Sequence, residues 1–401
     1  MAEWKECTIA DIGTVVGGAT PSTKKPENYE GGTIAWITPK DLSSFSGRYI
    51  KCGERNITEE GLKSCSTQLL PVNTVLFSSR APIGYIAIAE NEVCTNQGFK
   101  SVIPNEDTDP LFLYYLLKYN KEAIENMGSG TTFKEVSGNT MKGIRVKVPK
   151  EIESQRKIAS ILGAIDDKIE ENERINNNLE QQAQAIYSSW FGNYEPFAGS
   201  RPSDWVDGTI DDLAKEIICG KTPSTKKVEY YGDDIPFITI PDMHGNPYIV
   251  ATERKLSKLG AKSQSKKSLH PNSICVSCIG TAGLVSLVSE ESQTNQQINS
   301  IVPTDGYSPY YIYLLMKSLT EIINKLGQSG STIVNLNKTQ FGKISVTIPS
   351  IAVMQQFDTI VSPIFKLILS NQLENIKLSS LRDVLLPQLM SGNIDVSDID
   401  I

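Results

Sequence analysis

The stretch SQRKIASILGAIDDKIEENERINNNLEQQAQAIYSSW, from Ser154 to Trp190, decides the fold of this 401-residue chain. It contains no proline and one glycine, and its residues form a ladder with a spacing of seven. The ladder consists of Ile158, Ile165, Asn172, Leu179 and Ile186. This heptad pattern is typical of a helix that packs lengthwise on another helix. We therefore predict one continuous helix here, roughly 57 Å long at 1.5 Å per residue.

The partner of this helix is encoded in the same chain, because the ladder occurs a second time. Adding 199 to each number gives Phe357, Ile364, Asn371, Leu378 and Leu385. The regions before the two ladders repeat as well: GGATPSTKK at 17–25 matches CGKTPSTKK at 219–227, and TNQ at 95–97 matches TNQ at 294–296. The offset stays within 199–202 throughout, which indicates a tandem repeat rather than coincidental turn motifs.

Each repeat has the pattern of an α+β domain with a mixed or antiparallel sheet. Short apolar runs separated by Gly, Pro and Asn predict strands. In the first repeat these runs are Thr33–Thr38, Thr74–Ser78, Ile83–Ala89, Gly98–Ile103 and Ile144–Val148. Apolar residues at a spacing of three and four predict a helix over Pro110–Asn126.

The fold class that follows is α+β, with two tandem repeated domains, each followed by a long helix. A pseudo-twofold relation between the repeats would make the two helices pack as an antiparallel coiled coil. The expected boundaries are a first domain at 1–150, the first long helix at 151–192, a linker at 193–203, a second domain at 204–350, the second long helix at 351–391 and a tail at 392–401.

One asparagine occupies the same layer of each ladder, near the middle of each helix. Midpoints meet in an antiparallel pair, so we expect Asn172 and Asn371 to lie side by side. A buried asparagine in such a seam fixes the register at some cost in stability. The alternative is that both side chains are solvated.

Charge and composition limit the possible functions without choosing among them. The net charge of −7 is concentrated in the helical regions, where 151–200 carry −5 and 351–401 carry −3, whereas 1–150 are neutral and 201–350 carry +1. We expect no membrane span, because no apolar run approaches roughly 18 residues, and no secretion signal. Seven cysteines, an odd number, favour a reducing cytoplasm.

The sequence offers no convincing catalytic or metal site. Only two histidines are present, His244 and His270. The run Cys219–Thr222 resembles a phosphate loop but has Lys215 where the first glycine is required. The pair Cys275 and Cys278 has no second pair and falls in a predicted strand. We therefore expect no catalytic residue and no metal in this chain.

The remaining polar residues lie on predicted loops and are candidates for contact with DNA. Arg and Lys bind phosphates or guanine edges, and Asn and Gln can recognise adenine edges. The candidates are Thr20, Ser22, Lys24, Lys25, Arg80, Asn96, Gln97, Thr132, Lys134, Ser224, Lys226, Lys227, Arg254, Lys255, Lys258, Asn295 and Gln296. The alternatives stay open: solvated lysines, and Thr-Pro-Ser-Thr and Asn-Gln turns that merely satisfy the backbone.

Several of these stretches together resemble the specificity subunit of type I restriction–modification systems. The resemblance rests on the Trp4 and Trp205 starts, the two Gly-x-Thr-Pro-Ser turns, Ser-Arg-x-x-Ile-Gly at 79–84, and Asn-Gln at 96–97. It also rests on Val-Pro-(x)5-Gln-(x)2-Ile at 148–158 and Leu-Leu-Pro-Gln-Leu-Met-Ser-Gly at 385–392. One departure is Cys278-Ile279-Gly280 where the first repeat has Ser79-Arg80-Ala81, which puts an equivalent basic contact in doubt.

The resemblance implies a DNA-recognition subunit that is not itself an enzyme. Each α+β repeat would be a target recognition domain for one half of a bipartite, asymmetric site in double-stranded DNA. The helix pair would set the spacing and dock two methyltransferase subunits, and restriction subunits would join the complex. S-adenosylmethionine, ATP and Mg²⁺ would then belong to the partner subunits. The rival hypotheses are a self-sufficient DNA-processing enzyme and a protein-only scaffold built on the helix pair.

Overall fold

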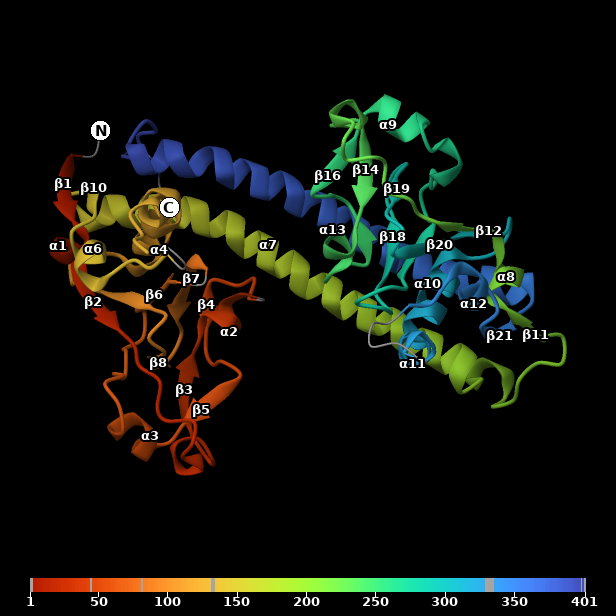
Figure 1. Ribbon diagram of the computed structural model, residues 1–401, viewed down its shortest axis with the longest axis horizontal. Coiled ribbons are helices and arrows are strands. Elements are labelled where there is room, and N and C mark those ends of the chain that lie inside the picture. The colour runs from red at the N-terminus through yellow and green to blue at the C-terminus, as the bar shows by residue number, and fades with distance from the viewer. Residues whose placement is uncertain are drawn as a thin grey trace. The chain divides into compact units, whose positions relative to one another are not determined.

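The computed structural model describes residues 3–43, 45–80, 82–130, 134–328, 335–397 and 399. The chain divides into two compact units (Figure 1). Unit 1 consists of residues 1–170 and 377–401, and unit 2 consists of residues 171–376. Both long helices contribute residues to both units, because each unit boundary falls inside one of them.

Unit 1 contains a five-stranded sheet, a three-stranded sheet and a two-stranded ribbon. In spatial order the five strands are β2 (Gly13–Gly17), β9 (Lys100–Pro104), β6 (Val75–Ser79), β7 (Ile83–Ala89) and β4 (Tyr49–Ile50). The small sheet is β5 (Arg55–Ile57), β3 (Ile34–Ile37) and β8 (Cys94–Thr95), and the ribbon is β1 (Trp4–Thr8) with β10 (Arg145–Pro149). The β4–β7 and β3–β8 pairs are parallel and the others antiparallel, so of the two predicted alternatives, a mixed or an antiparallel sheet, the mixed one is observed.

Unit 2 repeats this plan with one additional strand. Its five-stranded sheet is β12 (Ala214–Cys219), β20 (Ile298–Pro303), β17 (Ile274–Ser277), β18 (Val285–Val288) and β15 (Tyr248–Ile249). Its small sheet is β13 (Tyr231–Gly232), β16 (Arg254–Leu256), β14 (Ile235–Ile238) and β19 (Gln293–Thr294), and its ribbon is β11 (Val206–Thr209) with β21 (Ser345–Ile348). The duplication in the sequence is therefore a duplication of strand order.

Short helices cover and connect these sheets. Those of unit 1 are α1 (Ile9–Ile12), η1 (Pro26–Asn28), α2 (Pro39–Ser43), α3 (Glu59–Lys63), α4 (Pro110–Tyr119), α5 (Lys121–Asn126) and α6 (Gly138–Lys142). Those of unit 2 are η2 (Ser188–Gly192), η3 (Glu195–Phe197), α8 (Ile210–Leu213), η4 (Val228–Tyr230), η5 (Ile240–Met243), α9 (Lys258–Lys262), η6 (Ser265–Lys267), α10 (Pro309–Ser318), α11 (Thr320–Gly327) and α12 (Lys338–Gly342).

The helix predicted over Pro110–Asn126 is in fact two helices. α4 ends at Tyr119 and α5 begins at Lys121, so the break falls at Asn120. The equivalent break in unit 2 falls at Leu319, between α10 and α11, with nearly the same backbone angles (φ −89° and ψ 1°, against φ −88° and ψ 3° at Asn120). The break therefore belongs to the duplicated fold, and in unit 1 the Asn120 side chain also donates to the backbone oxygen of Leu116 at 2.8 Å.

The two long helices are α7 (Ile152–Tyr187) and α13 (Ile351–Ser391), and they pack together within each unit. In unit 1, Ile158 and Leu162 of α7 share a core cluster with Leu386 and Leu389 of α13. In unit 2, α13 supplies the buried residues Met354, Phe357, Val361, Phe365 and Ile368. The predicted antiparallel pair is thus confirmed, and each half of it completes the core of one unit.

Asparagines line this pair, and Asn172 and Asn371, which we expected to lie side by side, each hydrogen bond to the asparagine one helical turn along from the other. Asn172 donates to Asn375 Oδ1 at 2.8 Å, and Asn371 donates to Asn176 Oδ1 at 2.9 Å. Because Asn176 and Asn375 are also separated by 199 residues, exchanging the two helices maps one pair onto the other. The local twofold relation therefore holds although Asn172 does not bond to Asn371.

Composition alone would let α13 cross a membrane, contrary to the expectation from the sequence. It contains an 18-residue window with a mean hydropathy of 1.2, of which 28% is buried. The apolar side chains of one face of α13, such as Phe357 and Phe365, belong to the core of unit 2. This packing accounts for part of the apolar composition, and exposed side chains on α13 account for the rest.

The segment predicted as a linker, 193–203, packs on unit 2. The rings of Tyr194 and Phe197 lie 5.7 Å and 5.3 Å from that of Trp205, in edge contacts. Aromatic pairs in this geometry add to the energy of area burial. The segment is thus anchored by its own side chains.

Candidate nucleic-acid interface

Each unit brings the Thr-Pro-Ser-Thr-Lys-Lys turn against the Thr-Asn-Gln loop, two segments far apart in sequence. In unit 1 the N–H of Ala19 donates to Thr95 O at 3.0 Å, and in unit 2 the N–H of Lys221 donates to Thr294 O at 2.9 Å. A Cβ added at Gly18 would lie 2.1 Å from Thr95 O, and one added at Gly220 would lie 2.1 Å from Asn295 O. Glycine is therefore required at both positions for the two backbones to approach. We call each of these meeting points a recognition corner.

A threonine and a glutamine side chain meet at each corner. The Thr20 hydroxyl donates to Gln97 Oε1 in unit 1, and the Thr222 hydroxyl donates to Gln296 Oε1 at 2.6 Å in unit 2. These bonds use the glutamine carbonyl oxygen, and both glutamines are exposed. The NH2 group of each glutamine, which these bonds do not use, is suited to donate to a base edge or a phosphate.

The neighbouring asparagines shape the corners from within. Asn96 Oδ1 accepts from the N–H of Gly98 at 2.8 Å, and Asn295 Oδ1 accepts from the N–H of Gln297 at 3.0 Å. Asn295 is 8% exposed. These bonds support the interpretation that both asparagines satisfy the backbone, and they leave the glutamines as the outward-facing amides.

The Thr-Pro-Ser-Thr-Lys-Lys turns are held from behind by a tyrosine. Tyr29 donates to Pro21 O at 2.6 Å, and Tyr231 donates to Pro223 O at 2.9 Å. The remaining candidates on the turns are exposed: Ser22, Lys24, Lys25, Ser224, Lys226 and Lys227. Lys227 additionally donates to the Tyr230 hydroxyl at 3.0 Å and lies over its ring. The tyrosine bonds thus hold both turns in place, and the turns present serine and lysine side chains to solvent.

A shallow cleft lies beside each turn, lined by equivalent residues. The unit 1 cleft has a volume of about 450 Å³ and is lined by Thr23, Pro26, Tyr29, Glu30, Arg55 and Asn56. The unit 2 cleft has a volume of about 530 Å³, and its lining includes Thr225, Tyr231, Arg254 and Lys255. The candidates Arg254 and Lys255 are exposed on β16, and Lys258 is exposed on α9. In unit 1 the pairing of β3 with β5 brings Arg55 and Asn56 to the turn, and of these two the sequence did not single out Asn56.

The third group of candidates differs between the units. Arg80 lies 3.8 Å from Glu135, which also pairs with Lys100 at 3.6 Å, and Lys134 is exposed next to it. The backbones of Arg80 and Glu135 also form an isolated antiparallel β-bridge, and the equivalent backbone bridge in unit 2 joins Ile279 to Asn335. Ile279 and Asn335, the residues at this bridge in unit 2, carry no charge, which agrees with the departure seen in the sequence at Cys278-Ile279-Gly280. The candidate Thr132 lies outside the described residues.

An arginine ties the five-stranded sheet of unit 1 to α7. Arg48, 4% exposed, donates to Glu170 Oε1 at 3.0 Å and to Gly163 O at 3.3 Å, and it also pairs with Asp167. Burial alone would lower the pKa of Arg48, but the hydrogen bonds to Glu170 and Asp167 raise it above its ordinary value. A charged arginine therefore fixes the start of β4 against the helix.

A glutamine holds the corresponding strand of unit 2. Gln372 accepts from the N–H of Tyr248 at 3.2 Å and donates to Tyr248 O and Asn246 Oδ1, both at 3.0 Å. The amide side chain thus forms two bonds to the backbone of β15. Neither this contact nor that of Arg48 was predicted, because both join residues more than 100 positions apart.

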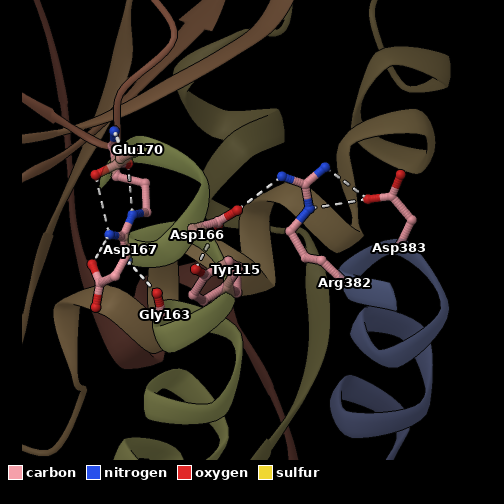
Figure 2. Close-up of polar contacts among 8 residues, drawn as sticks. Tyr115, Gly163, Asp166, Asp167, Glu170, Arg382 and Asp383 are labelled. Atoms are coloured by element: carbon pink, nitrogen blue, oxygen red, sulfur yellow. Dashed lines mark hydrogen bonds and ion pairs between the residues drawn. The ribbon is translucent and has the colours of Figure 1, made fainter. Parts of the chain in front are cut away.

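A second polar cluster lies between α4, α7 and α13 of unit 1 (Figure 2). The buried Asp166 accepts from the Tyr115 hydroxyl at 2.7 Å and from Arg382 at 2.8 Å. Burial raises the pKa of Tyr115, and the nearby Asp166 carboxylate raises it further, so the phenol stays protonated and donates. Arg382 also donates to Asp383 at 2.9 Å. The cluster stabilises the packing of the helices and lies away from the recognition corner.

Side chains that could bind a metal do not gather in the described part of the chain. No set of three or more His, Cys, Asp or Glu side chains there could hold a metal ion. Burial raises the pKa of both Cys275 and Cys278 to about 12, so these thiols are protonated.

Comparisons with known proteins agree with this geometry. The family described as "Type I restriction modification DNA specificity domain" matches residues 1–181 and 202–381. The type I restriction enzyme MjaIX specificity subunit of Methanocaldococcus jannaschii is 33% identical over 99% of this chain and 95% of its own length. The HindI specificity subunit of Haemophilus influenzae is 32% identical over 98% of this chain and 100% of its own length.

A solved structure shows the same fold. The S subunit of a type I restriction–modification system from M. genitalium superposes with a TM-score of 0.60, covering 97% of this chain and 96% of that one, at 16% identity. Two matched specificity domains, each with its recognition corner, and relatives that align over nearly their full length lead to one assignment. This chain belongs to the specificity subunits of type I restriction–modification systems, the non-catalytic subunits that recognise DNA target sites.

Proposed function

We propose that each recognition domain, 1–150 and 204–350, reads one half of a bipartite, asymmetric site in double-stranded DNA. The observation that carries this proposal is the pair of recognition corners. Each has the same backbone frame and the same Thr–Gln contact, but the surrounding residues differ. Two readers with one frame and different side chains are suited to two half-sites of different sequence.

At each corner we assign base contacts to the exposed glutamine, Gln97 or Gln296. We assign further base contacts to the exposed cations of the neighbouring clefts, Arg55, Arg254 and Lys255. The lysines of the turns, Lys24, Lys25, Lys226 and Lys227, are placed to bind phosphates. Asn96 and Asn295 keep the loops in shape rather than contact DNA. Arg80, which already has Glu135 close by, would need to exchange that partner for a phosphate.

We assign the two long helices to spacing and to assembly. α7 has 36 residues and α13 has 41, and a 36-residue helix is about 54 Å long. In unit 2, α13 exposes Ile360, Leu367 and Leu373 at 43–47%, although its opposite side is in the core. Exposed apolar side chains on a helix are suited to bind another protein. We therefore assign methyltransferase subunits to this surface, and two of them to the complex, which restriction subunits complete.

The chemistry of the complex belongs, in this proposal, to its other subunits. S-adenosylmethionine would be bound by the methyltransferase subunits, and ATP and Mg²⁺ by the restriction subunits. The whole complex would act in the cytoplasm, in keeping with seven cysteines that are all free thiols.

Exchange of one recognition domain tests the proposal. Residues 204–350 are replaced by the corresponding region of the MjaIX specificity subunit, and the chimaera is expressed with the methyltransferase subunits of this system. Sequencing that detects methylated bases should show one half-site changed and the other retained. The matched control replaces 1–150 instead and should change the opposite half-site. If either exchange altered both half-sites, the assignment of one half-site to each domain would be wrong.

A further inference from the structure

Helix α9 and turn η6 place four lysines on one short surface of unit 2. They are Lys258, Lys262, Lys266 and Lys267. The first three are exposed and the fourth is half-buried. We propose that this α9–η6 surface binds the phosphate backbone of double-stranded DNA, and that unit 1 has no counterpart to it. This inference rests on the proposed function and adds an electrostatic difference between the two readers.

The equivalent surface of unit 1 has the opposite charge. Glu59 stands where unit 2 has Lys258, Glu60 where it has Leu259, and Thr67 and Gln68 where it has Lys266 and Lys267. Lys63 is the counterpart of Lys262 and lies 3.9 Å from Glu59, with which it pairs across one helical turn. The segment 59–68 therefore has a net charge of −1, and the segment 258–267 has a net charge of +4.

This charge difference is carried by the same scaffold in both units. The Thr58 hydroxyl accepts from the N–H of Gly61 at 3.0 Å, and the Ser257 hydroxyl accepts from the N–H of Gly260 at 3.1 Å. A Cβ at Gly61 would lie 2.4 Å from Asn28 O, and one at Gly260 would lie 2.0 Å from Tyr230 O. α3 is thus packed closely against η1, and α9 is packed in the same way against η4. The two surfaces therefore differ in charge but share one backbone arrangement.

The α9–η6 surface is fixed to the recognition corner of its own unit. Gln264, between the two helices, donates to Lys221 O and to Gln293 Oε1, both at 2.8 Å. Gln264 is 8% exposed. Lys221 is the residue that hydrogen bonds to Thr294 at the corner. Phosphates held by the lysines would therefore have a defined position relative to the corner, which is what a positioning contact requires.

The four lysines are also available to bind an anion. Among the described residues of unit 2, the ion pairs involve other cations, namely Arg174, Arg201, Lys215, Lys317 and Lys325. One carboxylate is close: Asp234 accepts from the backbone N–H of Lys258 at 3.1 Å. Within unit 2, α9 lies at the end remote from α13 (Figure 1). A protein bound to the exposed face of α13 would leave it uncovered.

Double-stranded DNA is the partner that fits this surface best. The duplex offers a regular array of phosphates, and lysines bind them without regard to sequence. Each phosphate contact releases counterions, so the affinity for DNA falls with salt more steeply as contacts are added. We therefore expect unit 2, which has these four lysines in addition to Lys226 and Lys227, to supply more of the salt dependence of DNA binding than unit 1, which has Lys24 and Lys25.

The salt dependence of binding by the assembled complex tests the proposal. The dissociation constant is measured by fluorescence anisotropy on a duplex with the target site and on one without it, between about 50 and 200 mM salt, the range in which phosphate contacts dominate. The variant K258Q/K262Q/K266Q/K267Q should reduce the slope of log Kd against log salt by up to about 3.6, since each contact contributes about 0.9. The loss should be the same on both duplexes, and the methylated sequence should be unchanged.

Unit 1 provides the matched controls. K63Q should leave the slope unchanged, because its lysine is paired with Glu59. The variant E59K/T67K/Q68K should increase the slope, because it builds the unit 2 surface on the unit 1 scaffold. A quadruple variant with the slope of the parent, or one that loses binding to anionic vesicles or RNA but not to DNA, would overturn the inference. Absence of any preference for the target duplex in the parent complex would instead count against the proposed function.

Discussion

The same helical position serves opposite chemistries in the two units. Asp166 of α7 and Phe365 of α13 are separated by 199 residues and occupy equivalent places in the repeat. Asp166 is 5% exposed and binds Tyr115 and Arg382, whereas Phe365 is fully buried and stacks on Tyr310 with ring centroids 4.6 Å apart. One unit therefore uses a polar cluster where the other uses an aromatic one.

The contacts that hold β4 in unit 1 and β15 in unit 2 also differ, being charged in unit 1 and neutral in unit 2. Unit 1 fixes β4 with the charged Arg48, and unit 2 fixes β15 with the neutral Gln372. The comparison shows that the duplicated fold specifies where the helix and the sheet must be joined but not which chemistry joins them. The stability of unit 1 should therefore depend on ionic interactions, and that of unit 2 on apolar packing and amide bonds.

The largest expected effect is that of Phe365→Ala. It removes a buried ring from contact with Tyr310 and Tyr313 and should cost about 3–5 kcal/mol. Amide hydrogen exchange, followed element by element, should show faster exchange in α10 and unchanged exchange in α4. Equal acceleration in both helices would mean that the two units unfold together.

Asp166→Asn should have the next largest effect and should act on unit 1 alone. The amide keeps one acceptor but loses the charge that pairs with Arg382, which is 19% exposed. We expect a loss of about 1.5–3 kcal/mol, seen as faster exchange in α4. The second substitution Arg382→Met should restore part of the loss, because it removes a largely buried charge that would otherwise keep only the exposed Asp383 as its ion-pair partner. A fully additive double variant would show that the two side chains are not coupled.

The smallest effect tests the ionic character of the unit 1 contact. Arg48→Gln should cost about 1–2 kcal/mol at low salt, because the guanidinium loses hydrogen bonds to Glu170 and Asp167. Both carboxylates are partly exposed, so the cost should decrease as salt screens the pair. Gln372→Ala is the control: it leaves backbone groups of the buried Tyr248 without a partner, and its cost should not change with salt. Both variants are denatured in about 0.05 M salt, where screening is weak, and in about 0.5 M salt, where it is strong. The cost of Arg48→Gln should differ between the two salt concentrations, and that of Gln372→Ala should not.

Much of the fold could be predicted because it depends on periodicity and duplication. The strand predicted over Ile83–Ala89 has those bounds, and the heptad ladders identified both long helices. The structure differs from the prediction over Pro110–Asn126, where the helix is broken at Asn120. Its counterpart in unit 2 is broken at Leu319, so a backbone turn shared by both units interrupts the helix, and apolar periodicity does not reveal that turn.

The recognition corners could be predicted in part. The sequence identified the turns and the Thr-Asn-Gln loops, since they are duplicated, but not that Thr20 binds Gln97 or that Arg55 reaches the same region. These contacts depend on strand pairings between segments up to about 80 residues apart, which local patterns do not encode. The anchoring roles of Arg48 and Gln372 were missed for the same reason.

The glycines of the corners have a consequence for the design of new specificities. A side chain at Gly18 or Gly220 would collide with a carbonyl oxygen of the opposing loop, so a mutant library that varies these positions would consist mostly of misfolded clones. Gln97 and Gln296 are exposed and joined to the frame through one hydroxyl each, so they accept variation without such a collision. In a library that keeps the two glycines and randomises the two glutamines, the variants would therefore differ in DNA recognition rather than in their ability to fold.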